Sequence, residues 1–462
     1  MINWMHIGGG NIFRMFPARA AQELLEAGLM KNGIAVVETF DHEIIEKNFI
    51  KNKTIAVTLR SNGEIITKEV KSISAAYKNT QPEAMEAFLS PDLQMISFTI
   101  TEKGYAPPNH NEDSENAMLF IAHGLIARAA EGLAPIALVS MDNCSRNGDV
   151  LRNGVSAAME MINPTGKAAR AYLSACAFPW TAIDKITPRP SEFIAKKLKE
   201  SGLSDGVIHV TKKGTWVADF VMAEETEYLL IEDAFPSGRP PLHETGIIFT
   251  NRETVEKFEN MKVRACLNPL HTALSVCGCL LGVSVVSECM KESVIKDFIK
   301  ALSKETTSVV SDPEVISPSV FLEDVLEKRL TNPFIGDTVE RIVLDTSSKI
   351  PIRFGENIKL RRERGLSDNE LKLIPLFFAL WLRYLQGKDD LYNVLEVQYD
   401  PRASELIPKL DSIEQILKDE SVWGADLYFE EAYLAQKTNA YFEVLQPLGA
   451  VRETLKNAIA KI

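Results

Sequence analysis

The first half of the chain alternates short apolar, β-rich runs with helical runs, and this order constrains the fold more than any other feature. Strand-like runs are INWMHI (2–7), IAVVETF (34–40), MISFTIT (95–101) and APIALVSM (134–141), and a helical run, ARAAQELLEAG, separates the first two. Strands that alternate with helices pair in parallel through crossover connections. The sequence therefore predicts an α/β fold built on a parallel sheet.

The second half has a different character, because long helical patterns dominate from about residue 251. Examples are KESVIKDFIKALSK (291–304) and LKLIPLFFALWLRYLQG (371–387). A chain of 462 residues also exceeds the size at which one hydrophobic core usually stops growing. We therefore predict an α/β domain over 1–250 and a mainly α-helical domain over 251–462. The Pro- and Gly-rich segment 232–246 is interpreted as their connection.

The charge balance and the cysteines argue against several classes of protein. The net charge is −12 without a basic patch, which opposes nucleic-acid binding. The longest apolar stretch, 271–287, is shorter than the roughly 20 residues of a membrane span and is expected to be a buried helix. The six cysteines form no CxxC pair, and Cys277 and Cys279 would point about 200° apart on a helix. We expect a cytoplasmic protein with reduced thiols, no metal and no membrane or nucleic-acid partner.

A glycine turn follows the first strand. Gly8-x-Gly10 stands between that strand and the helix expected over 17–27, as in the first half of a dinucleotide fingerprint, although Phe13 replaces the third glycine. Glu38 ends the second strand, 28 residues after Gly10, where a carboxylate can accept both ribose hydroxyls and repel a 2′-phosphate. The predicted cofactor is therefore NAD, in a Rossmann-type domain whose first strand lies at the centre of the sheet. A plain turn with Glu38 as a solvated strand end is the alternative.

The stretch KVRACLNPLH (262–271) places a lysine, an asparagine and a histidine inside an apolar, helix-like run. Hydride removal from a secondary alcohol needs a base for the hydroxyl proton and donors for the developing alkoxide. Lys262 can be the base if burial lowers its pKa from about 10.4, Asn268 can donate from its amide, and His271 can position the substrate hydroxyl. Taken singly, each residue has an ordinary structural explanation.

Seven segments together resemble the long-chain polyol dehydrogenases, a family that comprises mannitol 2-dehydrogenase and the fructuronate and tagaturonate reductases. They are HIGGGNIFR (6–14), SFTITEKGY (97–105), SMDNCSRNG (140–148), FPWTAIDKITP (178–188), IEDAFPSGRP (231–240), KVRACLNPLH (262–271) and RIVLDTSSKIPIRF (341–354). The match covers nearly the whole chain in order. The resemblance implies a zinc-independent NAD(P) enzyme with a lysine base.

The resemblance also implies roles for individual residues. Lys262 corresponds to the general base, Asn268 and Asn143 to the two amides that hold the alkoxide, His271 to the residue that positions the substrate, and Glu259 to a proton-path carboxylate. In the substrate site, Asp184 corresponds to the family's aspartate.

For Glu102 the resemblance implies only that it lies near the active site, and we group it with the cofactor contacts. The other expected cofactor contacts are Gly8, Gly10, Asn11, Ile12, Phe13 and Glu38; the family's modified glycine motif, which ends in Phe-Arg, accounts for Phe13 and Arg14.

One spacing departs from the family. Lys262 and Asn268 are six residues apart, where five is usual. On a regular helix, Lys262, Asn268 and His271 would point to about 0°, 240° and 180°, but one bulged residue brings them to about 0°, 140° and 80°. Pro269 favours a bulge because it lacks the N–H that would bond the carbonyl of Ala265. We therefore predict an irregular turn between Arg264 and Pro269, or a new helix that Asn268 caps.

The substrate is expected to be a sugar acid or a polyol. A carboxylate on the substrate would favour an arginine in the substrate site. Arg353 is the candidate for this arginine, with Lys349 as a helper, and an ordinary pair of surface residues is the alternative. The run Arg361, Arg362 and Arg364 is interpreted as solvated. The segments GNIFR, IEDAFPSGRPPL and KIPIRFGE resemble the hexuronate branch of the family more than the mannitol branch. The resemblance therefore implies a reaction that interconverts D-fructuronate and D-mannonate. Mannitol 2-dehydrogenase, tagaturonate reductase and a non-catalytic NAD-binding regulator are alternatives, and the oligomeric state, including a monomer, stays open.

Overall fold

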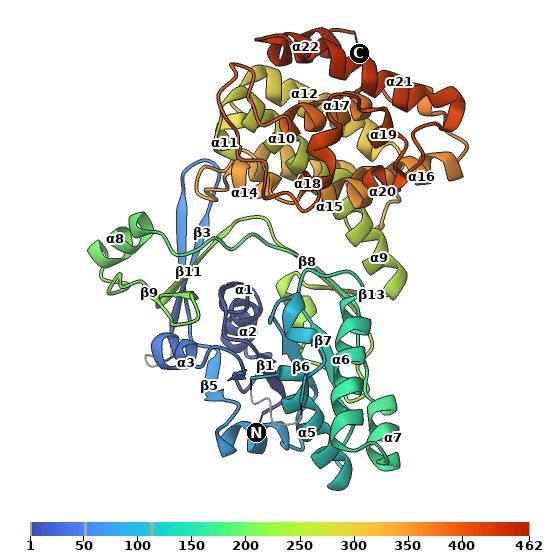
Figure 1. Cartoon of the computed structure of the whole chain (residues 1–462). Helices are drawn as coiled ribbons and strands as arrows, with labels where there is room; N and C mark the ends of the chain where they lie inside the picture. The colour runs from blue at the N-terminus through green and yellow to red at the C-terminus, as the bar shows by residue number, and fades with distance from the viewer. Residues whose placement is uncertain (1, 50–52, 111–114, 462) are drawn as a thin grey trace. The chain divides into compact units, whose positions relative to one another are not determined.

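The computed structural model describes residues 2–49, 53–110 and 115–461. The chain divides into two compact units, Met1–Glu256 and Lys257–Ile462, which we describe separately. Unit 1 is the α/β part and unit 2 is mainly helical (Figure 1). The predicted fold class, an α/β part followed by a mainly helical part, is therefore confirmed.

A parallel five-stranded sheet forms the centre of unit 1. Its strand order is β5-β2-β1-β6-β7, and every adjacent pair is parallel. The strands are β1 (Trp4–Ile7), β2 (Ile34–Glu38), β5 (Ile73–Lys78), β6 (Met95–Phe98) and β7 (Ala137–Ser140). The first strand is central, as predicted, so its glycine turn opens at the middle of the sheet's carboxyl edge. That edge is where ligands bind in open α/β sheets.

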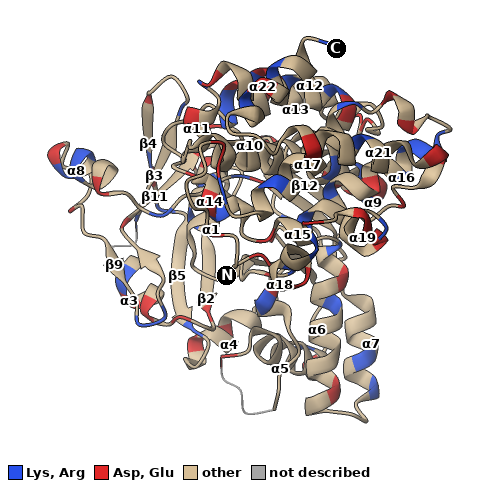
Figure 2. Ribbon diagram, turned by 45° about the horizontal axis from the view of Figure 1, so that its top comes forward, with Lys and Arg blue, Asp and Glu red and all other residues tan. Residues whose placement is uncertain are grey.

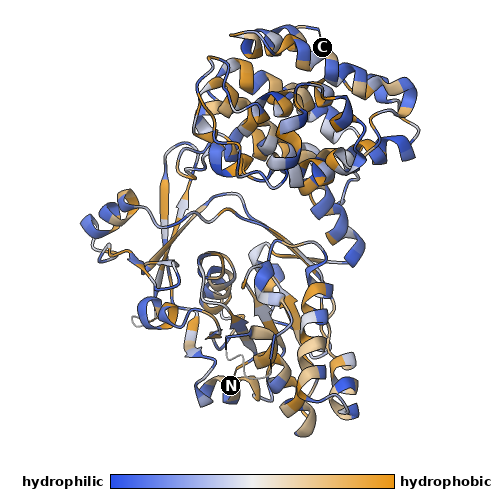
Figure 3. Cartoon of the chain, viewed as in Figure 1, coloured by the Kyte–Doolittle hydropathy of each residue, from blue (hydrophilic) through white to orange (hydrophobic). Residues whose placement is uncertain are grey.

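The two faces of this sheet are covered by different helices. Trp4 of β1 packs with α1 (Asn11–Met15) and α2 (Pro17–Glu26), whereas its neighbour Met5 packs with helices on the opposite face. This alternation is the two-residue period of a strand. The second face holds α4 (Pro82–Phe88), α5 (Ala117–Ala130), α6 (Asn147–Ile162) and α7 (Lys167–Ala175). Figure 3 shows the apolar residues of α5 and α6 beside the sheet, and Figure 2 shows acidic and basic residues interspersed along α6 and α8 (Glu192–Glu200).

Three smaller sheets were not expected from the sequence. They are β11-β3-β4 (Phe220–Glu224, Thr54–Leu59, Ile65–Val70), β13-β12-β8 (Ile248–Thr250, Tyr228–Glu232, Thr181–Asp184) and the hairpin β9-β10 (His209–Val210, Trp216–Val217). Because β12 and β13 pair with each other, the segment 232–246 between them lies inside unit 1. The interpretation of this segment as the connection between the two halves is therefore wrong.

Unit 2 packs its helices around two apolar ones. All residues of α17 (Leu373–Leu385) are buried, and α10 (Asn268–Leu281) is buried over most of its length. The buried helix predicted over 271–287 is therefore confirmed up to Leu281, where Gly282 in a left-handed conformation ends it and the exposed Ser284 follows. Among the described residues no helix is long and apolar enough to cross a membrane. The other helices are α9 (Arg252–Met261), which begins in unit 1, then α11 (Val286–Cys289), α12 (Ser293–Thr307), α13 (Pro318–Glu323), α14 (Val339–Val343), α15 (Thr346–Ile350), α16 (Glu356–Glu363), α18 (Ala403–Leu406), α19 (Glu414–Leu417), α20 (Glu420–Trp423), α21 (Phe429–Val444) and α22 (Ala450–Ile459).

Candidate active site

The first and last glycines of the turn, Gly8 and Gly10, differ in what surrounds them. Gly8 has φ of 102°, and a Cβ there would lie 2.5 Å from the carbonyl oxygen of Thr99. Its N–H donates to Val37 at 2.9 Å, so Gly8 locks the turn onto β2. Gly10 has an ordinary φ of −72°, and a Cβ there would meet no atom within 4 Å. The fold therefore requires glycine at position 8, whereas at position 10 the space stays open above the backbone.

Glu38 braces this turn from the end of β2. Its Oε2 accepts the N–H of Gly9 at 2.9 Å, and its Oε1 accepts the N–H groups of Thr39, Phe40 and Asp41. The side chain is buried, so the interpretation of Glu38 as a solvated strand end is wrong. Since Oε2 accepts a single N–H from the residues that the structure describes, it keeps acceptor capacity for a ribose hydroxyl.

Phe13, the residue in place of the third fingerprint glycine, packs under the turn. Its ring stacks on His6 with 3.9 Å between centroids. The imidazole nitrogens of His6 lie 2.6 Å from Ser97 Oγ and 2.9 Å from Thr99 Oγ1, and burial holds the pKa of His6 well below 6.5. Beside it in α1, Ile12 is half-buried and Asn11 Oδ1 accepts Nη2 of the buried Arg14.

Two loops at the carboxyl edge of the sheet carry Glu102 and Asn143, and both side chains are exposed. Glu102 begins η1 (Glu102–Tyr105), and Asn143 follows β7. Asp142 joins the loops because it accepts the N–H of Ile100 at 2.7 Å and the hydroxyl of Tyr105 at 2.6 Å. Burial raises the pKa of both Asp142 and Tyr105. No sequence pattern predicts these hydrogen bonds, since their partners are about 40 residues apart.

Asn147 connects the same loop to β8. Its side chain donates to Thr181 Oγ1 at 2.9 Å and accepts the N–H of Thr181 at 2.9 Å. A Cβ on Gly148 would lie 2.4 Å from the carbonyl oxygen of Phe178, which explains the Asn-Gly pair. Asp184, at the other end of β8, is buried.

In unit 2, Lys262 begins a π-helical turn, η3 (Lys262–Cys266). The N–H of Leu267 donates to the carbonyl of Lys262 at 3.2 Å, five residues back. Side chains that are distant in the sequence donate hydrogen bonds to two backbone carbonyls of this turn. Thr306 Oγ1 donates to the carbonyl of Ala265 at 2.8 Å, and Asn357 Nδ2 donates to the carbonyl of Arg264 at 3.2 Å. The predicted irregularity is confirmed.

The capping variant of that prediction is wrong. Leu267 is the N-cap of α10, and Asn268 is its first residue, with Pro269 following it in the first turn. The side-chain amide of Asn268 makes no hydrogen bond to any residue that the structure describes, whereas its carbonyl accepts Nη1 of Arg353 at 3.0 Å. Lys262 itself is buried, and Glu259 in α9 is half-buried.

His271 lies among cations. Burial, and then the charges of Arg353, Arg341 and Lys349, lower the pKa of His271 from 6.5 to about 3. Arg329 adds a weaker effect of the same sign. Asp337 Oδ2 lies 3.7 Å from His271 Nε2, but its other oxygen accepts Nε of Arg341 at 3.0 Å. His271 is therefore neutral near pH 7, and it can donate or accept a hydrogen bond.

Arg353 and Lys349 are not an ordinary surface pair. Arg353 also donates to Thr272 Oγ1, and burial lowers its pKa to about 10. Lys349 Nζ donates to the carbonyl of Ile342 at 2.6 Å and pairs with Asp345, with its side chain 17% exposed.

Arg353 and Arg329 each stand in a further π-helical turn, η5 (Pro351–Gly355) and η4 (Asp324–Arg329), and η3 packs on η5. Such turns are frequent at functional sites.

The prediction that Arg361, Arg362 and Arg364 form a solvated run is wrong for the first two. Arg361 is buried and pairs with Glu370 at 2.6 Å, while Arg362 pairs with the buried Asp368 at 2.7 Å. Of the three, Arg364 alone is exposed. The first two arginines hold unit 2 together and are not a solvated run.

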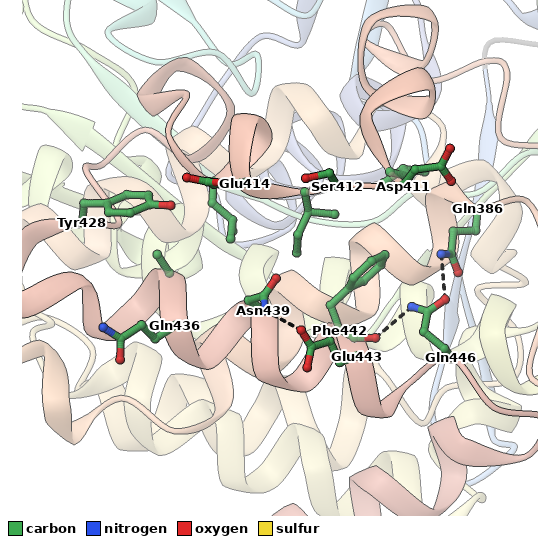
Figure 4. A pocket seen from close by; sticks show the side chains of 14 residues that line it. Gln386, Asp411, Ser412, Glu414, Tyr428, Gln436, Asn439, Phe442, Glu443 and Gln446 are labelled. Carbon is green, nitrogen blue, oxygen red and sulfur yellow. Dashed lines mark hydrogen bonds between the residues drawn. The ribbon is translucent and has the colours of Figure 1, made fainter.

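A pocket of about 690 Å³ elsewhere in unit 2 lies between α19 and α21 (Figure 4). Acidic and amide side chains such as Glu414, Asn439 and Gln446 line it, and the residues predicted for catalysis do not. Asn439 Nδ2 donates to Glu443 Oε1 within α21, and Gln446, which follows the helix, donates from Nε2 to the carbonyl of Phe442. We find no group of His, Cys, Asp and Glu that could hold a metal within the described ranges, and Cys277 and Cys279 are both buried.

Comparison with known proteins decides the family. The mannitol dehydrogenase Rossmann domain matches residues 2–244, and the mannitol dehydrogenase C-terminal domain matches residues 254–445. The chain belongs to the mannitol dehydrogenase family. It is therefore an oxidoreductase of the polyol dehydrogenase type.

Within the mannitol dehydrogenase family, the D-mannonate oxidoreductase of Thermotoga maritima is 40% identical over 99% of this chain and 92% of that protein. The mannitol 2-dehydrogenase of Aspergillus fumigatus is 30% identical over 79% of this chain and 74% of that protein. The identity is thus higher to a sugar-acid enzyme than to this polyol enzyme.

Two solved structures share the fold. Mannitol 2-dehydrogenase of Pseudomonas fluorescens, in a ternary complex with NAD and D-mannitol, superposes with a TM-score of 0.75 at 23% identity over 100% of this chain and 95% of that one. A substrate-free D-sorbitol dehydrogenase gives 0.81 at 23% identity over 98% and 95%.

Proposed function

We propose that this member of the family is an NAD-dependent oxidoreductase that interconverts D-fructuronate and D-mannonate. The observation that carries the proposal is the group of cations around His271. A hexuronate carries a carboxylate that a ketose such as fructose lacks, and cationic side chains bind carboxylates. Guanidinium groups bind carboxylates with geometric specificity. Among these cations, the half-buried Arg353 donates to the carbonyl of Asn268 and to Thr272 Oγ1. The 40% identity to a D-mannonate oxidoreductase supports the same substrate class.

The glycine turn fits a dinucleotide. The open space above Gly10 admits a phosphate against the backbone, and Glu38 Oε2 keeps capacity for a ribose hydroxyl. A carboxylate at this position disfavours a 2′-phosphate, so we expect NAD rather than NADP. The cofactor contacts we propose are Gly8, Gly10, Asn11, Ile12, Phe13, Glu38 and Glu102. When bound, the reduced cofactor supplies the hydride that reduces the C5 ketone.

Five residues are proposed to act on the substrate oxygen. Lys262 gives its proton to the alkoxide in reduction and takes it back in oxidation, and its burial excludes competing water. Asn268 and Asn143 donate amide hydrogens to the developing alkoxide. Neutral His271 positions the hydroxyl, because a protonated imidazole would compete with the lysine as the acid. Glu259 is the proposed carboxylate of the proton path.

Three residues are proposed to bind the remainder of the substrate. Arg353 and Lys349 hold the carboxylate, and Asp184 accepts a hydroxyl. Within the part of the chain that the structure describes, Arg353 donates to Asn268 and Thr272 through Nη1 alone. Its Nη2 and Nε therefore keep capacity for the substrate carboxylate.

A substrate panel tests the proposal. Oxidation of NADH is followed with fructuronate, tagaturonate, fructose and fructose 6-phosphate. We expect kcat/KM for fructuronate to exceed that for fructose by about 10- to 100-fold, because a charged hydrogen bond contributes about 1.5–3 kcal/mol. Comparable or higher kcat/KM with fructose would make the protein a mannitol 2-dehydrogenase, and a preference for tagaturonate would make it that reductase.

Two variants separate the carboxylate site from the chemistry. Arg353→Gln should lower kcat/KM for fructuronate by about 10-fold or more and leave the lower value for fructose nearly unchanged. The exposed Arg364→Gln is the matched control. Lys262→Ala should reduce kcat by several orders of magnitude with little change in NADH affinity. Retained turnover in Lys262→Ala would refute the lysine mechanism, and binding of NADH without any turnover in the wild type would indicate a regulator.

A further inference from the structure

A second concavity in unit 1 touches the glycine turn. It has a volume of about 240 Å³ and is lined by Gly10 and Asn11 on one side, by α3 (Glu43–Asn48) on another, and by Trp216 of the β9-β10 hairpin. Figure 1 shows the hairpin beside α3. Neither the sequence motifs nor the proposed chemistry uses α3 or the hairpin.

Asn48, the last residue of α3, lines this pocket with an unsatisfied side chain. It is 2% exposed, and both its Nδ2 and its Oδ1 lack a hydrogen-bond partner. A buried amide without partners destabilises a fold by about 1–3 kcal/mol for each unmade bond, so such groups are rare unless a ligand completes them. The amide therefore points to a ligand that both accepts and donates hydrogen bonds.

Arg189 supplies a cation at the same pocket. Its guanidinium lies 5.7 Å from the centroid of the Trp216 ring, which holds it against the hairpin. No carboxylate pairs with it among the residues that the structure describes. The neighbouring lysines of unit 1 differ, since Lys185 and Lys213 are paired with Glu227 and Glu115. An uncompensated guanidinium beside open backbone favours an anion.

We propose that Arg189 and Asn48 are side-chain ligands of the dinucleotide where its pyrophosphate lies above Gly10 in this pocket. The inference rests on the proposed function and adds two contacts to it. Arg189 pairs with a phosphate oxygen above Gly10, Asn48 Nδ2 donates to a second oxygen, and Asn48 Oδ1 accepts a hydroxyl of the adjoining ribose. The pocket holds only this part of the cofactor, because its volume is far below that of a whole dinucleotide.

Titration of the full-length protein with NADH and NADPH, followed by nucleotide fluorescence, tests the proposal. Arg189→Gln should raise the Kd of both by about 10- to 100-fold and leave their ratio unchanged, because both carry the pyrophosphate. Asn48→Leu should raise both Kd values about 10-fold without lowering Tm, because it removes an unsatisfied buried amide. Arg152→Gln, an exposed arginine on α6, is the matched control and should bind both nucleotides as the wild type does.

The outcomes separate this inference from the proposed function. Wild-type protein that binds neither nucleotide would overturn the proposed cofactor and the inference together. Wild-type binding that is unchanged in Arg189→Gln and Asn48→Leu would overturn the inference alone. A loss confined to NADPH in Arg189→Gln would assign the arginine to a 2′-phosphate and would also overturn it.

Discussion

Acidification from about pH 8 to about pH 5 should lower the free energy of unfolding by about 2 kcal/mol through His271 alone. The folded-state pKa of His271 is about 3, and its ordinary value is 6.5. Between these values the unfolded chain binds a proton that the folded chain does not, so stability falls as the pH falls below 6.5. At about pH 5 the difference corresponds to roughly 1.5 pH units at about 1.36 kcal/mol each.

The assay compares wild type and His271→Gln by denaturant unfolding at the two pH values, with a probe that reports unit 2. The variant lacks the titrating group, so its loss between the two conditions should be smaller than that of wild type by about 2 kcal/mol. The subtraction also removes the contribution of His6, whose lowered pKa acts in the same direction. His243→Gln is the control, because this histidine is exposed. An equal loss in wild type and His271→Gln would refute the assignment of a neutral, half-buried imidazole.

Three further results are expected. Gly8→Ala should destabilise unit 1 by more than about 2 kcal/mol in thermal unfolding, because the added Cβ meets the carbonyl of Thr99. Gly10→Ala should leave Tm unchanged and raise the Kd of NADH, because the added Cβ meets no protein atom. Equal stability in both variants would contradict this reasoning. Tyr105→Phe removes a hydroxyl that lies 2.6 Å from Asp142 Oδ2 and 2.7 Å from Ser140 Oγ, so kcat should fall several-fold while the Kd of NADH stays constant. An unchanged kcat would show that these hydrogen bonds do not position the loop that carries Asn143. Iodoacetamide should label the half-buried Cys144 before Cys266, since burial raises the pKa of the Cys266 thiol to about 12. Mass spectrometry gives the order of labelling, and the reverse order would contradict the burial of Cys266.

Local rules were enough for the parts of the fold that depend on neighbours in the chain. The strand and helix periods predicted the parallel sheet, and the position of Gly8 behind the first strand predicted a turn that only glycine can form. The extra residue between Lys262 and Asn268, together with Pro269, predicted a helix irregularity, because a missing N–H and a fixed angular period act within a few residues.

Other features depended on segments that are distant in the sequence. Arg361 and Arg362 look like a solvated run until Glu370 and Asp368 fold back onto them. The carbonyls released by the π-helical turn are satisfied by Thr306 and by Asn357. No local pattern contains these partners, because hydrogen bonds and ion pairs of this kind form only after the helices pack.

The sequence by itself determined the order of the elements, the glycine turn and the identity of the chemically capable residues. Tertiary structure alone decided their electrostatic state. It brings cations from four other elements near His271, and it leaves Asn48 without hydrogen-bond partners beside Arg189. The physical reason is that chain propensity acts over a few residues, whereas desolvation and Coulomb interactions depend on every group that folding brings near.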